Sequence, residues 1–123
     1  MTKILIVEDD ISLLNLYNEV LKKEGFEIEL ADDGQQALLK AETFIPDVVL
    51  LDLMLPYIDG FEVLEKLKSN PITKDARVIV QTNLDSEIQK EKALKLGASE
   101  FLVKSDDNPG SLLKEIKKLL AIY

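Results

Sequence analysis

The sequence contains no cysteine and no histidine among its 123 residues. The absence of cysteine excludes disulfides and thiolate chemistry, and it leaves the redox compartment open. The absence of histidine excludes an imidazole base, a histidine metal ligand and a histidine phosphoacceptor within this chain. Any histidine chemistry in its function must therefore come from a partner.

The sequence also lacks long apolar runs and clusters of basic residues. Its first ten residues, MTKILIVEDD, place only four apolar residues before an acidic cluster, which is too short for a signal-peptide core. No stretch approaches the length of a membrane span, so we expect a cytoplasmic protein without membrane contact. The 23 acidic and 15 basic residues give a net charge of -8, which disfavours direct nucleic-acid binding.

A regular alternation of short apolar runs and longer amphipathic segments fills the chain, without repeats or linkers. The continuous apolar runs lie at residues 4–7, 48–51, 78–80 and 101–103, and a weaker alternating run lies at 26–30. Continuous runs of this kind are typical of strands buried on both faces of a parallel sheet. The length predicts one domain over residues 1–123, and the last amphipathic segment runs almost to its end, so we expect no output domain.

Each apolar run is followed by a segment with helical spacing. Glycines at positions 25 and 97 indicate helix ends. Two helix starts are indicated as well, one by a possible capping box of Ser86 and Gln89 and one by Asn108-Pro109. The apolar stripes are Leu13, Leu16, Tyr17, Val20 and Leu21; Ala37, Leu38, Ala41 and Phe44; Phe61, Leu64 and Leu67; and Leu112, Leu113, Ile116, Leu119 and Leu120. This order predicts an α/β fold, a doubly wound five-stranded parallel sheet with five helices and the flavodoxin-like strand order 2-1-3-4-5.

Polar side chains stand where four of the predicted strands end. They are Glu8, Asp9 and Asp10 after the first strand, Asp52 after the third, Thr82 after the fourth and Lys104 after the fifth. Ligands of this fold bind beyond the carboxyl ends of the first and third strands, so these residues should converge there. Asp10 is better explained as a cap of the first helix.

Carboxylates that converge without compensation repel one another until one of them takes a proton. A divalent cation removes this problem, and Mg²⁺ binds oxygen ligands with only one or two carboxylates from the protein. Lys104 supplies a further positive charge, and the hydroxyl of Thr82 supplies a small donor. These residues together predict a pocket for a phosphoryl group, whose transfer depends on positioning and charge neutralisation.

Four motifs in this order resemble the receiver domains of two-component response regulators. They are the acidic pair in VEDD, the aspartate in LLDLMLPYIDG, the threonine in VIVQT and the lysine in FLVK. The resemblance covers the whole chain. It implies a signalling phosphoacceptor of a phosphorelay, single-domain and similar to chemotaxis regulators, which catalyses only its own phosphoryl transfer and slow self-dephosphorylation.

The resemblance also implies roles for individual residues. Asp52 matches the phosphoacceptor, which takes the phosphoryl group from a phosphohistidine of a partner sensor histidine kinase. Asp9 matches a direct Mg²⁺ ligand, together with Asp52 and the backbone carbonyl of Met54, whereas Glu8 matches the residue that holds metal-bound water. Lys104 matches the lysine that pairs with the phosphoryl oxygens.

The signal in such domains is carried by a switch. Thr82 matches the hydroxyl that moves toward the phosphoryl group, and Phe101 matches the aromatic whose rotamer follows it. The surface that changes its affinity for a downstream protein corresponds to residues 84–121, and the phosphorylated form is a possible homodimer. The downstream target is unknown from the sequence.

Several positions depart from the family pattern. Ser105 replaces a proline after the lysine, Asn83 replaces a small residue after the threonine, and Tyr57 stands where glycine is frequent. Met54 and Leu84 flank the site with side chains that cannot orient a hydrolytic water, so we predict slow self-dephosphorylation.

Other functions remain open at this point. The chain could be a phosphorelay intermediate, a receiver fragment of a larger regulator, or a degenerate receiver that acts as a constitutive binding module. A Mg²⁺-dependent phosphatase is disfavoured because Met54 replaces the second acid that such enzymes often carry. A flavodoxin-type cofactor binder is disfavoured by the acidic site and by the absence of tryptophan.

Overall fold

The computed structural model describes residues 1–83, 86–104 and 109–121. Within these residues, five strands alternate with five helices along the chain. The strands are β1 (Lys3–Val7), β2 (Glu27–Ala31), β3 (Val48–Asp52), β4 (Arg77–Thr82) and β5 (Glu100–Val103). The helices are α1 (Ile11–Lys23), α2 (Gly34–Phe44), α3 (Gly60–Ser69), α4 (Glu87–Lys95) and α5 (Pro109–Leu120).

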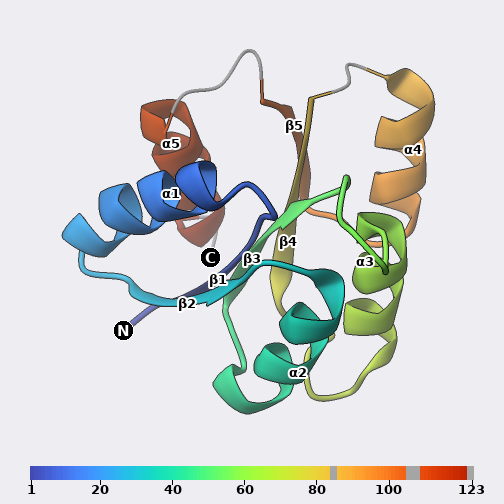
Figure 1. Ribbon diagram of the computed structural model, residues 1–123, viewed down its shortest axis with the longest axis horizontal. Coiled ribbons are helices and arrows are strands. Elements are labelled where there is room, and N and C mark those ends of the chain that lie inside the picture. The colour runs from blue at the N-terminus through green and yellow to red at the C-terminus, as the bar shows by residue number, and fades with distance from the viewer. Residues whose placement is uncertain (84–85, 105–108, 122–123) are drawn as a thin grey trace.

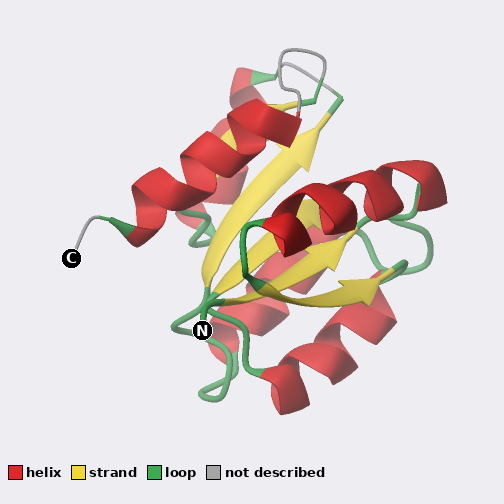
Figure 2. Cartoon of the chain, turned by 90° about the vertical axis from the view of Figure 1, so that its left-hand side faces the viewer, coloured by secondary structure: helices red, strands yellow, loops and turns green. Residues whose placement is uncertain are grey.

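All five strands form one parallel sheet in the order β2-β1-β3-β4-β5, which confirms the predicted architecture. Helices α1 and α5 cover one face of the sheet, and α2, α3 and α4 cover the other (Figure 1). The strands run side by side, and their carboxyl ends all lie at the same end of the sheet (Figure 2). The order places β1 and β3 next to each other, with Val7 opposite Leu51.

Each central strand divides its side chains between two apolar cores. On β1, Ile4 and Ile6 pack toward α1 and α5, whereas Leu5 and Val7 pack toward the opposite face. The same division holds on β3, whose five residues are all buried. A strand buried on both faces needs apolar residues at every position, which explains the continuous runs in the sequence.

In the first helix, the buried side chains differ in part from the predicted apolar stripe. Asp10 caps α1, as expected, because its Oδ1 accepts a hydrogen bond from the N–H of Leu13 at 3.2 Å. The buried residues are Leu14, Tyr17 and Leu21, whereas Leu16 is exposed. Leu16 lies about 200° around the helix from Leu14, since each residue turns the helix by about 100°. The expectation that Leu16 belongs to the core was therefore wrong.

The predicted helix ends are largely confirmed. Gly25 and Gly97 follow α1 and α4 with positive φ values of 89° and 108°, a conformation that favours glycine. Ser86 caps α4 by accepting the N–H of Gln89 at 3.3 Å. The reciprocal half of the capping box is absent among the described residues, since Gln89 Oε1 has no hydrogen-bond partner there. Asn108 lies outside the described residues.

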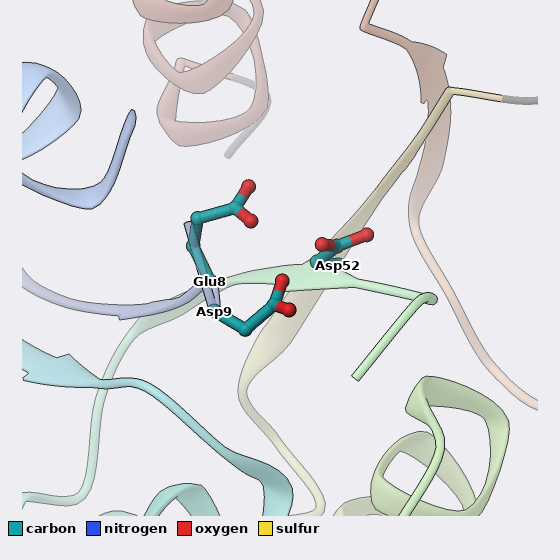
Figure 3. Close-up of side chains that lie close together, drawn as sticks. All are labelled: Glu8, Asp9 and Asp52. Carbon is teal, nitrogen blue, oxygen red and sulfur yellow. The ribbon is translucent and has the colours of Figure 1, made fainter. Parts of the chain in front are cut away.

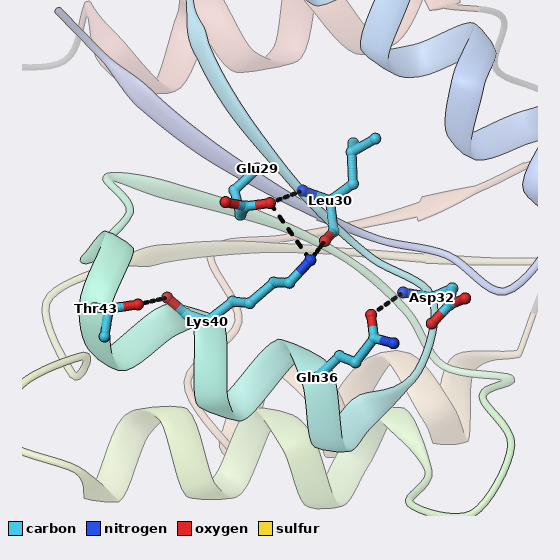
Figure 4. A network of polar contacts seen from close by, with 6 residues as sticks. All are labelled: Glu29, Leu30, Asp32, Gln36, Lys40 and Thr43. Carbon is cyan, nitrogen blue, oxygen red and sulfur yellow. Dashed lines mark hydrogen bonds and ion pairs between the residues drawn. The ribbon is translucent and has the colours of Figure 1, made fainter.

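One of the two edge strands of the sheet is β2, and a polar network covers part of it (Figure 4). The Nζ of Lys40 on α2 donates to the Leu30 carbonyl at 2.6 Å and lies 3.4 Å from Glu29 Oε1. The same Glu29 oxygen accepts the N–H of Leu30 at 3.1 Å. Both backbone groups of Leu30 are therefore bound by side chains on the side away from β1.

Candidate functional site

Among the described residues, four of the five buried polar or charged side chains lie toward the carboxyl ends of β1, β3 and β4, and the fifth, Thr73, lies before β4. Asp52 is the last residue of β3 and is 5% exposed, and Glu8 follows β1 and is 2% exposed. Thr82 ends β4 and is fully buried. A buried charge is unfavourable unless it is paired, so the surroundings of Glu8 and Asp52 decide what this site can do.

An acidic cluster forms where β1 and β3 end. Carboxylate oxygens of Glu8, Asp9 and Asp52 all lie within 4.8 Å of one another, and Asp9 is the exposed member. Figure 3 shows the three side chains turned toward a common space. The predicted convergence of these three residues is therefore present, whereas Asp10 caps α1 and donates its N–H to Glu8 Oε2 at 3.2 Å.

Lys104 is the positive charge in this cluster. Its Nζ lies 2.5 Å from Glu8 Oε1 and 3.1 Å from Asp52 Oδ2, and its side chain is 9% exposed. One ammonium group therefore bridges two buried carboxylates that come from different strands. The sequence predicted that Lys104 would lie at the carboxyl ends of the strands. It did not indicate that Lys104 would lie closer to Glu8 than to Asp52.

The electrostatics of the cluster follow from burial and from this bridge. Burial raises the pKa of Glu8 from 4.5 to about 7; the hydrogen bond from Lys104 opposes this rise, and the negative charge of Asp52 adds to it. Burial lowers the pKa of Lys104, but the hydrogen bond to Glu8 and the charge of Asp52 outweigh it, so the net shift is upward. Lys104 is therefore charged at neutral pH, whereas Glu8 holds a proton up to a higher pH than an exposed glutamate does.

A cavity of about 310 Å³ opens at this cluster. Its lining consists of Glu8, Asp9, Asp10, Leu13, Asp52, Met54, Asn83 and Lys104. Asp9 and Asp52 thus line a space that can take a small ligand, and Asn83 contributes an exposed polar residue to the same lining. Thr82 is at the same edge of the sheet but is not among the described residues that line this cavity.

The remaining predicted site residues lie close to the cluster. Met54 donates its N–H to Asp52 Oδ1 at 3.1 Å, and its side chain is 60% exposed. Phe101 is opposite Val80 in the sheet and packs, half-buried, against the core on the α2–α4 face. The Lys104 N–H donates to the Thr82 carbonyl at 2.7 Å, which ties β4 to the residue after β5. Leu84 and Ser105 lie outside the described residues.

Gly60 is a residue of this site that the sequence motifs did not indicate. Its N–H donates to the Leu53 carbonyl at 3.0 Å, and a Cβ there would lie 2.5 Å from the Asp52 carbonyl oxygen and from Leu53 Cα. Only glycine fits this close approach of α3 to the end of β3. The pair Asp59-Gly60 was the available signal, since Asp59 caps α3 by accepting the N–H of Glu62 at 3.0 Å.

Similarity to known proteins agrees with this geometry. The model of the response regulator receiver domain matches residues 4–117. The chain belongs to the response regulator receiver domain family. Proteins of this family are signalling phosphoacceptors that bind Mg²⁺ at an acidic pocket and interact with sensor histidine kinases.

Two curated relatives and two solved structures illustrate the relationship. The chain is 38% identical over 102 residues to the alkaline phosphatase synthesis transcriptional regulatory protein PhoP of Bacillus subtilis, covering 83% of this chain and 42% of PhoP. It is 40% identical over 106 residues to the response regulator PleD of Caulobacter vibrioides, covering 86% of this chain and 23% of PleD. The chain therefore spans less than half the length of these relatives.

The solved structures match almost end to end. A CheY-like receiver domain protein from Methanospirillum hungatei is 32% identical with a TM-score of 0.90, covering 98% of this chain and 94% of that one. The chemotaxis response regulator CheY4 of Vibrio cholerae is 33% identical with a TM-score of 0.89, covering 96% and 98%. In the described part of the present chain, no helix combines the length and apolarity of a membrane span.

Proposed function

We propose that Asp52 accepts a phosphoryl group from a phosphohistidine of a partner sensor histidine kinase. The observation that carries this proposal is the Lys104 ammonium group bridging Glu8 and Asp52 at the bottom of an acidic cavity. A carboxylate oxygen of Asp52 forms the new bond to phosphorus, and the N–P bond of the phosphohistidine breaks. Its electron pair returns to the imidazole of the partner, and the product on this chain is an acyl phosphate.

The acidic cluster fits a Mg²⁺ ion by the chemistry of its donors. Mg²⁺ prefers hard oxygen ligands, and three carboxylates from different residues lie within 4.8 Å of one another, one of them exposed to solvent. We propose that Asp9, Asp52 and the Met54 carbonyl hold the ion and that Glu8 holds it through water. When bound, Mg²⁺ neutralises charge on the carboxylates and on the incoming phosphoryl oxygens.

The protein side chains have separate tasks in this reaction. The Lys104 ammonium group lies 3.1 Å from Asp52 Oδ2, so it can orient this carboxylate as a nucleophile and pair with phosphoryl oxygens once they arrive. We assign Thr82 and Phe101 to the switch that follows phosphorylation, because Thr82 is buried at the end of β4 and Phe101 lies on the adjacent strand. A buried hydroxyl can change its partner only if its surroundings shift as well.

The output of the switch is proposed to be a protein-binding surface within residues 84–121. Helix α4 supports this role because its first turn carries Ile88, a large apolar side chain that is 82% exposed. Phosphorylation changes affinity only if the partner binds the two states of the chain differently. We place the reaction in the cytoplasm, where ATP-dependent kinases and Mg²⁺ are available.

The direct test is the intact mass of the purified protein after incubation with Mg²⁺ and acetyl phosphate. A single phosphate adduct is expected in the wild type, and none is expected for Asp52→Asn or in the absence of Mg²⁺. Asp33→Asn is a matched control, since Asp33 caps α2 and lies outside the acidic cavity. An adduct that persists in Asp52→Asn would refute the assignment of Asp52. If no adduct appears with acetyl phosphate or with a phosphohistidine donor, the chain is a constitutive binding module.

A further inference from the structure

The loop between β3 and α3 contains a strained turn centred on Tyr57. The φ value of Tyr57 is 68°, and the N–H of Ile58 donates to the Pro56 carbonyl at 2.8 Å, which closes a three-residue turn. A γ-turn with positive φ is the rarer and more strained of the two γ-turn forms. A residue with a Cβ loses stability in this conformation, and glycine does not.

The tyrosine side chain does not offset this strain by packing. It is 95% exposed, so its ring buries almost no apolar surface in the folded chain. Only two described residues other than glycine have positive φ, and the second is Ile45, which caps the carboxyl end of α2. The stability of the fold therefore gives no reason for a tyrosine at position 57, and strain that persists at an exposed position suggests a function.

The position of this turn connects it to the reactive carboxylate. The loop is fixed to the end of β3 because Met54 donates its N–H to Asp52 and Gly60 donates its N–H to Leu53. Met54 lines the acidic cavity and is 60% exposed, and Tyr57 follows three residues later on the same short loop. An exposed thioether thus lines the cavity that contains Asp52, and an exposed aromatic ring follows it three residues later on a loop that is tied to the end of β3.

We propose that Tyr57 is a docking residue for the protein that donates the phosphoryl group; this inference rests on the function proposed above. A phosphohistidine on a folded partner can reach Asp52 only if the partner surface covers the rim of the cavity. A small phosphodonor enters the cavity without reaching the rim. The partner is therefore a protein with an apolar contact surface beside its phosphohistidine.

The physical properties of Tyr57 suit this contact. Aromatic side chains are frequent among the residues that dominate binding energy, because they bury a large area with few rotatable bonds. The strained turn holds the ring away from the chain before the partner arrives, which lowers the entropy lost on binding. The strained turn thus lowers the stability of the free chain, and it preorganises the docking surface.

The experiment compares two kinds of phosphodonor on the variant Tyr57→Gly. Purified sensor histidine kinases of the source genome, autophosphorylated with ATP, serve as protein donors, and acetyl phosphate serves as the small donor. With the kinase that labels the wild type fastest, Tyr57→Gly should lower kcat/KM of transfer about tenfold, as expected for losing an important interface aromatic. Its labelling by acetyl phosphate should be unchanged, and its denaturation midpoint should be unchanged or raised, because glycine relieves the turn.

Ile45→Gly is the matched control. It relieves the same kind of backbone strain immediately before β3, whereas Tyr57 lies after it, so Ile45→Gly should leave both transfer rates at wild-type values. Tyr57→Phe keeps the ring and should retain most of the kinase rate.

The outcomes separate the two proposals. Normal transfer from the kinase to Tyr57→Gly overturns the docking role, and so does an equal loss with both donors, which would mean that Asp52 itself was disturbed. A wild-type chain that is labelled by acetyl phosphate but by no kinase also overturns it. If the wild type is labelled by neither donor, the proposed function fails instead.

Discussion

The two ends of the sheet use similar polar residues for different purposes. At the carboxyl end, Glu8, Asp52 and Lys104 contact one another through their charged groups. At the amino end, Asp47 accepts the N–H of Lys3 at 2.8 Å, and Arg77 donates to the Leu119 carbonyl at 2.8 Å. Asp47 and Arg77 at the amino end thus bind backbone groups and hold chain segments together, whereas Glu8, Asp52 and Lys104 at the carboxyl end also bind one another and line a cavity.

The two ends of the sheet also differ in the size and lining of their cavities. The amino-end cavity is the larger, about 580 Å³ against about 310 Å³ at the acidic cluster. Its lining combines the exposed apolar residues Ile45 and Ile72 with the ionisable residues Asp47, Asp75 and Arg77. The size of a cavity therefore does not single out the candidate site, whereas the buried contact of Lys104 with both Glu8 and Asp52 does.

The largest effect should come from removing the cation at the carboxyl end. Lys104→Met leaves the buried carboxylates of Glu8 and Asp52 without their counter-charge, which should destabilise the fold by about 3–5 kcal/mol at pH 8. The loss should be smaller at pH 5, where Glu8 takes up a proton. Denaturant unfolding at both pH values measures the difference, and equal losses at the two would contradict this account of the site.

Gly60→Ala should have the next largest effect. The added Cβ would lie 2.5 Å from the backbone of Asp52 and Leu53, which cannot move aside as a flexible side chain does. We expect a loss of about 1–3 kcal/mol together with impaired phosphorylation of Asp52. Gly25→Ala is the control, because its Cβ meets nothing within 4 Å and it should lower stability, by about 1 kcal/mol, without changing phosphorylation. A fully active Gly60→Ala variant would show that the close approach does not position Asp52.

The pH dependence of stability should reveal the raised pKa of Glu8. Because its pKa is raised in the folded state, from 4.5 to about 7, the folded chain binds more protons than the unfolded chain between these values. The resulting stability is complete below pH 4.5 and is lost as the pH rises to about 7, at no more than about 1.4 kcal/mol per pH unit. Subtracting the profile of Glu8→Gln isolates this contribution. A difference that is flat over this range would refute the raised pKa.

The smallest effect is expected at the amino end. Arg77→Met removes the hydrogen bond to Leu119 while keeping much of the apolar stem, so the free energy of unfolding should fall by about 1 kcal/mol. Labelling by acetyl phosphate should stay at the wild-type level. If Arg77→Met impaired labelling as strongly as Lys104→Met, the two ends of the sheet would not be functionally distinct.

The sequence was a good guide to the fold because burial on both faces leaves a simple pattern. Its apolar runs located all five strands, although β4 begins at Arg77 and extends to Thr82, beyond the predicted 78–80. Strand ends carry polar residues that periodicity cannot separate from loops. The exposure of Leu16 was missed because several apolar residues of α1 are compatible with more than one stripe.

The sequence predicted which strand ends form the candidate site, but not which side chains contact one another there. The order of strands implied that Glu8, Asp9, Asp52 and Lys104 converge, and the structure brings them together. The choice of Glu8 as the shorter partner of Lys104 depends on side-chain rotamers, which no spacing rule specifies. The requirement for Gly60 and the strain at Tyr57 are likewise properties of the folded backbone.

The network on β2 has a consequence for a chain that shares the cell with others of its fold. An open strand edge offers its backbone to any neighbouring strand, and it adds a route to aggregation. In this chain Glu29 and Lys40 occupy both hydrogen-bonding groups of Leu30, so a passing strand would have to displace an ion pair before it could add to the sheet. The ion pair thereby makes the addition of a further strand at Leu30 less favourable.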